Sequence, residues 1–195
     1  STDDIAALSA AQIAAFNTAQ VPGLSTEQIA AIETADLRAL STANLRTLDT
    51  AQLAALTTEQ MAALSTAQVA SLTTSQVASL NTEDLNALSS QQFAALGSAQ
   101  LASMTTSQLA ALETADVAAI ASTNLRALGS TQLGALATES IAALSTAQSA
   151  ALTSTQVAGL STEQIAACET ADLRAMASAS LQALSTAQVE ALTTA

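Results

Sequence analysis

Large apolar residues recur along this chain at alternating spacings of three and five residues, so that the pattern repeats every eight residues. Each eighth position from Leu8 to Leu192 is apolar, and so is each position three residues earlier except Ser149. The second residue of each octad is almost always Thr or Ser, and the fourth is usually Gln. The consensus Ser-Thr-Ala-Gln-Leu-Ala-Ala-Leu continues without insertion or deletion, which predicts one array of twenty-four octads followed by three residues.

This period fits neither one long helix nor a strand. An α-helix has about 3.6 residues per turn, so eight residues overshoot two turns by roughly 80° and the apolar stripe would wind round the helix. Coiled coils accommodate mean apolar spacings of about 3.5 to 3.67 residues, whereas the mean here is four. In a strand, residues three apart would point to opposite faces. The pattern instead favours a short helix in each octad, with a break at each octad boundary.

The octad boundary carries helix-start signals, as residues 24–29 illustrate. Ser25 can be the N-cap, Gln28 then completes a capping box, and Leu24 can pack on Ile29 as a hydrophobic staple. The Thr one place later is a second candidate cap, and the sequence leaves the two registers open. Pro22 lies inside one of these helices and is expected to distort it. The second-place Thr or Ser is expected to serve in the octads that begin with Gly97, Ala121, Gly129, Ala137 and Ala177.

The charges follow the same register. Fifteen of the 16 acidic residues stand at octad positions one, three or four, in the first turn of the expected helix, and Glu190 is the exception. All four Arg residues stand at position six, nearer the other end. Acids near helix N-termini and bases near C-termini interact favourably with the helix dipole. Each Arg also follows an Asp or Asn by two residues, and we expect solvated salt bridges such as Asp36 with Arg38.

A helix of about six residues is not stable alone in water, so the octads have to pack on one another. We therefore predict an all-α fold, a solenoid or superhelix of about 24 very short helices, one per octapeptide repeat, as a single array over residues 1–195. The pattern does not set the number of octads per turn. Because neither end carries a polar capping repeat, we expect a piece of a longer repeat region, or ends that meet by head-to-tail association or ring closure.

The composition excludes several kinds of chemistry. The chain has no His, which rules out His-based metal sites and Ser-His-Asp triads. Its single Cys excludes an intrachain disulfide. A net charge of −12 makes nucleic acid a poor partner, and no apolar run is long enough for a membrane span. We expect no enzyme activity, no cofactor and no metal site, and the flanking repeats or an unidentified protein as partners.

Three features have both a structural and a functional interpretation. Cys168 replaces a Leu, and we interpret it as a small core residue rather than a reactive thiol. Acid pairs such as Glu83 and Asp84 suit calcium or paired-carboxylate catalysis, but a role at helix starts explains them better. Regular Thr rows suit an ice-binding face, but that face would occupy one side, whereas nearly every octad carries the Thr.

The sixth octad position is usually Ala, and its substitutions mark a candidate interaction surface. Clustering of these residues on one side would favour a protein-binding solenoid, and scatter would favour a spacer. The residues are Arg38, Arg46, Asn86, Arg126, Arg174, Gln182 and Glu190.

The run Thr-Ala-Gln-Leu-Ala-Ala-Leu, as in residues 50–56, resembles octapeptide arrays of very large Ala/Thr-rich proteobacterial surface or secreted proteins, some of them adhesin-like. The resemblance covers the whole chain and implies an extracellular or cell-surface spacer, stalk or scaffold. It carries no catalytic residue across. The calcium-binding nonapeptides of some such proteins are absent from this sequence, so calcium dependence is not implied. The alternatives are a protein-binding solenoid and an ice-binding protein.

Overall fold

The computed structural model describes residues 1–192, and over this range the protein is helical without any β-strand. It divides into two compact units, Ser1–Leu96 and Gly97–Ala195, and each is described by itself. The boundary between them coincides with an octad boundary. The predicted all-α fold is confirmed. Residues 193–195, which begin a twenty-fifth octad in the sequence, lie outside the described range.

Each octad of the described chain supplies one helix. The first unit contains α1 (Thr2–Ala6), α2 (Ala10–Ala14), the 3₁₀-helix η1 (Val21–Gly23), α3 (Thr26–Ala30), α4 (Thr34–Leu37), α5 (Thr42–Leu45), α6 (Thr50–Ala54), α7 (Thr58–Ala63), α8 (Thr66–Ser71), α9 (Thr74–Ser79), α10 (Thr82–Asn86) and α11 (Ser90–Ala94). The second unit contains α12 (Ser98–Ser103), α13 (Thr106–Ala110), α14 (Thr114–Ala119), α15 (Ser122–Leu125), α16 (Ser130–Gly134), α17 (Thr138–Ala142), α18 (Thr146–Ala151), α19 (Ser154–Ala158), α20 (Thr162–Ala166), α21 (Thr170–Ala175), α22 (Ser178–Gln182) and α23 (Thr186–Leu192).

The third octad departs from the α-helical rule, as the sequence predicts. Its helix η1 has only three residues and is of the 3₁₀ type, with Pro22 in its first positions. Proline lacks the N–H that an α-helical hydrogen bond needs, and its ring crowds the preceding turn. The octad keeps its place in the array because Val21 still enters the core and is fully buried.

The first residue of the octad is the N-cap, which settles the register. Ser25 shows the full capping box: its Oγ accepts from Gln28 N at 3.2 Å, and its own N–H donates to Gln28 Oε1 at 2.9 Å. Acids occupy first turns and N-caps, and all four Arg residues stand at helix C-caps or in a last turn, as the dipole argument predicts.

The prediction that the second residue caps the Gly and Ala octads is wrong. Gly97 is itself the N-cap of α12, in an extended conformation with φ −84° and ψ 166°. Its N–H donates to Gln100 Oε1 at 2.8 Å, which is the half of the capping box that needs no side chain on the first residue. The extended first residue therefore keeps the helix start in place. The other octads of this kind likewise start at Ala121, Gly129, Ala137 and Ala177.

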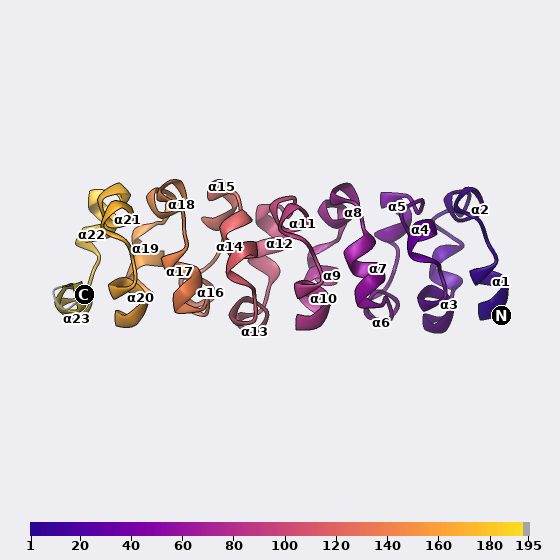
Figure 1. The fold of residues 1–195 in the computed structure, drawn as a ribbon, viewed down its shortest axis with the longest axis horizontal. Coiled ribbons are helices and arrows are strands. Elements are labelled where there is room, and N and C mark those ends of the chain that lie inside the picture. The colour runs from indigo at the N-terminus through magenta and orange to yellow at the C-terminus, as the bar shows by residue number, and fades with distance from the viewer. Residues whose placement is uncertain (193–195) are drawn as a thin grey trace. The chain divides into compact units, whose positions relative to one another are not determined.

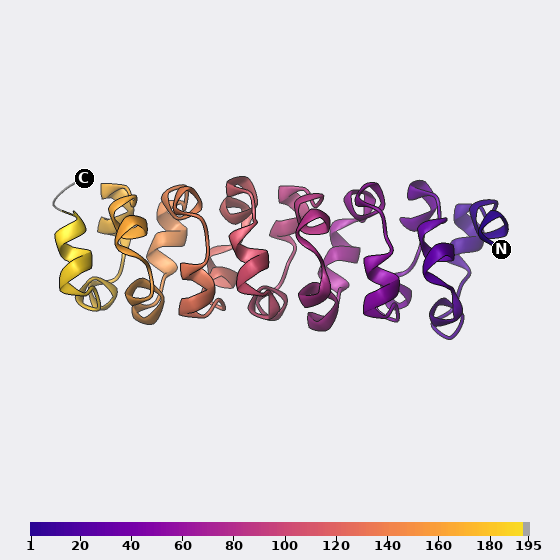
Figure 2. The same cartoon turned by 90° about the horizontal axis from the view of Figure 1, so that it is seen from below.

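Helices three octads apart in the sequence pack side by side within each unit. Examples are α5 with α8 in the first unit and α20 with α23 in the second. One turn of the coil therefore takes about three octads, a number that the sequence pattern leaves open. In both views the short helices of each unit are joined by brief extended segments and lie on different sides of the unit's core (Figure 1, Figure 2).

The core consists of the two apolar positions of each octad. From Ile29 to Ile165 the fifth-position side chains are 0–2% exposed, and from Ile32 to Leu160 the eighth-position side chains are 2–5% exposed. Small residues fill the space beside them and let the turns approach closely. A Cβ atom on Gly159 would lie only 2.7 Å from Ser130 Cβ, where the octads of α16 and α19 meet.

Candidate functional site

The most distinctive chemical feature of this protein is a polar side chain at the fourth position of each octad, which lies inside the coil in most octads after the first turn. Gln60, Gln68 and Gln76 are each only 2% exposed. A primary amide carries two N–H donors and one carbonyl acceptor, and burial without partners would cost free energy. Each buried amide group therefore needs hydrogen-bond partners inside the coil.

Gln76 shows the arrangement clearly. Its Oε1 accepts the N–H of Thr73, the N-cap of its own helix α9, at 2.8 Å. Its Nε2 donates to the backbone carbonyls of Leu45 and Leu48, both at 2.9 Å, which lie 31 and 28 residues earlier in the chain. One side chain thus joins the start of a helix to the end of a helix in the preceding turn.

The 28-residue register recurs in both units, and we call this set of bonds the glutamine ladder. In each case Nε2 donates to the carbonyl of an eighth-position residue at 2.6–2.9 Å. The last carbonyls of a helix have no partner within it, so the ladder supplies the donors that these short helices lack. Its members are Gln52, Gln60, Gln68, Gln76, Gln92, Gln132, Gln148, Gln156, Gln164 and Gln188.

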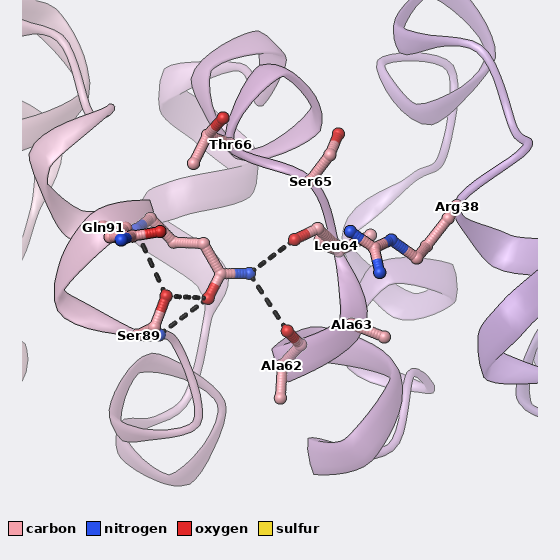
Figure 3. Close-up of a pocket in the computed structure, with 9 residues that line it drawn as sticks. Arg38, Ala62, Ala63, Leu64, Ser65, Thr66, Ser89 and Gln91 are labelled. Carbon is pink, nitrogen blue, oxygen red and sulfur yellow. Dashed lines mark hydrogen bonds between the residues drawn. The ribbon is translucent and has the colours of Figure 1, made fainter.

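Figure 3 shows one rung of the ladder at the edge of a groove of about 370 Å³. Gln92 Oε1 accepts from Ser89 N at 2.7 Å, and Nε2 donates to Leu64 O at 2.7 Å and Ala62 O at 3.3 Å. Arg38 extends along the opposite side of the groove, near Leu64 (Figure 3). Arg38 is the one ionisable side chain of this lining, so the groove brings together no acid and base.

Shorter side chains at the fourth position keep the register where they can donate. Asn44 Nδ2 donates to Phe16 O at 2.6 Å, and Ser180 Oγ donates to Leu152 O at 3.1 Å, and both acceptors lie 28 residues earlier. The acceptor position is therefore a property of the fold rather than of glutamine. A side chain at the fourth position that can donate reaches this acceptor.

Asp84 breaks this rule in the first unit. Its side chain is only 3% exposed, and its Oδ2 has no hydrogen-bond partner. Burial raises the pKa of the Asp84 carboxyl, and the charge of Glu83 adds to this, while a backbone hydrogen bond from Asn81 opposes it. An ionised carboxylate can only accept, so Asp84 supplies no rung towards the preceding turn while it is ionised.

The predicted salt bridges between Arg and a residue two places earlier are wrong. In the part of the chain that the structure describes, the four Arg residues make no ion pair within 4.0 Å, and the N-terminal amine pairs with Asp4 at 3.0 Å. Residues two apart lie on different sides of a helix and do not face each other. Exposed first-turn acids instead accept local hydrogen bonds: the backbone N–H of Glu27 itself, then the hydroxyls of Ser25 and Thr26, lower the pKa of Glu27.

All of the sixth-position candidate residues are exposed, and within each unit they stand in different octads. Arg174, Gln182 and Glu190 belong to the consecutive octads of α21, α22 and α23 and so lie on successive sides of a single turn. Arg38 and Arg46 are likewise C-caps of consecutive helices, α4 and α5. The remaining exposed candidates are Asn86 and Arg126.

Cys168 is half-buried at a core position, and its Sγ lies 3.4 Å from Gln164 O, to which it donates. Burial raises the pKa of the Cys168 thiol to about 11, with a further contribution from the charge of Asp172. The thiol is therefore protonated at neutral pH and is a weak nucleophile. This agrees with the interpretation of Cys168 as a packing residue.

Sequence reasoning assigned the fourth-position Gln to the capping box and missed its bond to the preceding turn. A signal for that second role was present in the choice of residue. Glu completes a capping box as well as Gln does, yet Glu occurs at no fourth position of this chain, whereas Gln occurs at fifteen. The bond that Gln donates to the preceding turn explains its preference over Glu, although Asp stands at five fourth positions.

Capped octad helices packed turn upon turn place this protein in the class of α-helical repeat solenoids. The sequence model of the ALTTAQ repeat matches six segments, residues 1–31, 29–66, 77–114, 109–146, 138–168 and 165–195. These segments cover most of the chain, which belongs to the ALTTAQ repeat family. No curated protein matches the sequence.

Across residues 1–192, no helix combines the length and apolar character needed to cross a membrane. Over the same range, no three His, Cys, Asp or Glu side chains come together as metal ligands would.

Replacing Gln76 by Ala tests the bond between turns. The substitution leaves the carbonyls of Leu45 and Leu48 without their side-chain donor, and we expect the free energy of unfolding to fall by about 1–3 kcal/mol in urea titrations followed by circular dichroism. Gln12→Ala is the matched control, because Gln12 makes the same local bond to Ser9 N but is exposed in the first turn. Equal losses for the two variants would contradict the ladder.

Replacing Asp84 by Gln is expected to add the missing rung and to stabilise the protein at neutral pH. The raised pKa of Asp84 in the folded state means that its contribution to stability is fully present below the unfolded pKa and is lost as pH rises through the folded pKa. The gain in Tm of Asp84→Gln should therefore be largest at pH 7 and shrink towards pH 4 (about the unperturbed Asp pKa). Glu33→Gln, at an exposed N-cap, is the control, and a pH-independent gain for Asp84→Gln would refute the explanation.

Proposed function

We propose that this chain is a structural repeat module that acts as a spacer, stalk or scaffold. The observation that carries the proposal is the glutamine ladder, in which turns inside each unit bond to the turn before them in a constant 28-residue register. Because one octad repeats the bonds of another, added octads extend such a coil without any new type of contact. Its length is then set by the number of octads.

We further propose that the parent protein is a large bacterial surface or secreted protein of the adhesin-like type. The support is the resemblance of the octad consensus to arrays in such proteins, and a composition without Lys and with a single Cys is compatible with that setting. The proposal assigns the chain no catalytic residue and no cofactor. The side chains around the groove beside Gln92 are mainly Ala, Ser and Thr, which suit a structural role.

The distribution of exposed residues supports a spacer over the alternative of a protein-binding solenoid. A recognition face would gather individual residues on one side, whereas Arg174, Gln182 and Glu190 lie on three successive helices. The Thr and Ser residues of the second position are similarly spread over nearly all the helices, and some bond to the next turn. Ser98 Oγ, for example, donates to Asn124 Oδ1 at 3.0 Å. Nothing in this arrangement favours an ice-binding face.

Spin-label distances within the first unit test the spacer role. Cysteines replace the exposed Ala14 and Ala94 in a Cys168→Ser background, and residues 49–72, which are three octads, are duplicated once or twice between them. Each duplication adds one turn, and we expect the label distance to rise in equal steps of about 8–10 Å with a narrow distribution.

A Gly/Ser insert of equal length is the control for this experiment. A flexible insert gives a broad distribution whose mean does not rise in equal steps. If the octad inserts behave like the Gly/Ser insert, or leave the distance unchanged, the spacer proposal fails.

A further inference from the structure

Asp84 interrupts the glutamine ladder between two intact rungs of the first unit. One octad earlier, Gln76 donates to Leu48 O at 2.9 Å, and one octad later the rung from Gln92 is also formed. In the same 28-residue register, the acceptor that corresponds to Asp84 is the carbonyl of Leu56. No residue of the described chain donates a hydrogen bond to this carbonyl. Two buried oxygens that both accept, Asp84 Oδ2 and Leu56 O, are therefore left without a donor.

A side chain of this size reaches the carbonyl 28 residues earlier. Asn44 stands at the same octad position and is isosteric with Asp, and its Nδ2 donates to Phe16 O at 2.6 Å. Asp84 is buried to a similar degree, with 3% of the residue exposed against 2% for Asn44. The carboxylate differs from the amide in one respect, since its oxygens carry no hydrogen to donate. Protonation of one oxygen supplies that hydrogen.

The surroundings of Asp84 favour the protonated carboxyl. The octads of α6 to α11 contain four acidic residues and no Arg or Lys, so they hold no base to compensate a charge on Asp84. The other three acids are exposed: Glu83 on α10 itself, Glu59 on α7, which packs against α10, and Asp49 at the N-cap of α6. Burial disfavours the charged form. It raises the pKa of the Asp84 carboxyl, and the charge of Glu83 raises this pKa further.

A proton suits this position better than a metal ion does. Ca²⁺ takes about six to eight oxygen ligands, whereas the ladder register brings one carboxyl group to the carbonyls of the preceding turn. Within residues 1–192, no three His, Cys, Asp or Glu side chains gather as metal ligands. We propose that Asp84 takes up a proton on Oδ2 and that this O–H donates a hydrogen bond to the carbonyl of Leu56. We call this bond the acid rung.

The acid rung makes one turn of the first unit sensitive to pH. The proton comes from the solvent and returns to it when the carboxyl ionises, so no other reactant is needed. Because the pKa of Asp84 is raised in the folded state, the contribution of the bond is fully present below the unfolded pKa and is lost as pH rises through the folded pKa. The Gln rungs keep their donors throughout this range. The proposal does not depend on the spacer role, since it concerns one bond inside the unit.

Carbon-13 nuclear magnetic resonance of the full chain, titrated through the ordinary Asp value of about 3.9 to neutral pH, tests the acid rung. We expect the side-chain carboxyl carbon of Asp84 to titrate with a midpoint above that value, and the backbone carbonyl carbon of Leu56 to shift with the same midpoint. The carbonyl carbon of Leu40, which accepts from Gln68, is the internal control and should not follow this titration. A Leu56 signal that does not follow Asp84, or an Asp84 midpoint at or below the ordinary value, overturns the proposal.

Asp84→Asn is the matched variant, because an amide at this position can donate at every pH, as Asn44 does. The Leu56 carbonyl signal of the variant should keep its acid position throughout the titration. In the unsubstituted chain, amide hydrogen-exchange protection of α10 relative to α8 should rise about two- to tenfold from neutral to acid pH, and in the variant this ratio should stay constant. A Leu56 signal that still titrates in Asp84→Asn, or a protection ratio with the same pH dependence in both chains, contradicts the acid rung.

Discussion

The fold depends on one constraint, which is that helices of four to seven residues leave nearly all their terminal N–H and C=O groups without partners inside the helix. The fourth-position Gln supplies hydrogen-bond partners to both kinds of group. Its Oε1 accepts the first N–H of its own helix, and its Nε2 donates to the last carbonyls of a helix one turn earlier, as Gln76 does with Thr73 and Leu48. Helices too short to persist alone are thereby stabilised by the neighbouring turns.

The same constraint explains the residue choices of the octad. A short donor at the fourth position is enough for the bond between turns, so Asn44 and Ser180 can replace Gln and still reach the carbonyl 28 residues earlier. Asp84 cannot donate while it is ionised, and its buried Oδ2 has no partner. The fifth and eighth positions are apolar because they fill the space between turns, and the positions beside them are small because the turns approach closely at residues such as Gly159. Octads with the same sequence therefore make the same set of contacts.

Much of this architecture is readable from the sequence because its causes are local. The period of eight, the capping box around Ser25, the acids in first turns and the distortion at Pro22 all concern residues within one octad. The number of octads per turn and the Nε2 bonds depend on residues about 28 positions apart. Because all octads are alike, the sequence does not indicate which of them contact each other. The wrong predictions, on the caps of the Gly and Ala octads and on the Arg salt bridges, also concern residues within one octad. Gly97 keeps the cap without a side chain, and Arg38 cannot face Asp36 two residues away.

Hydrogen exchange of the glutamine side-chain amides measures the ladder most directly. In nuclear magnetic resonance spectra of the chain labelled with ¹⁵N on glutamine, the account predicts that the Nε2 hydrogens of Gln60, Gln68, Gln76 and Gln156 exchange slowly, because they are buried in bonds to backbone carbonyls. Those of Gln12 and Gln20, which share the same octad position in the exposed first turn, should exchange at the rate of free amides. Equal and rapid exchange at all six positions would contradict the claim that these side chains hold successive turns together.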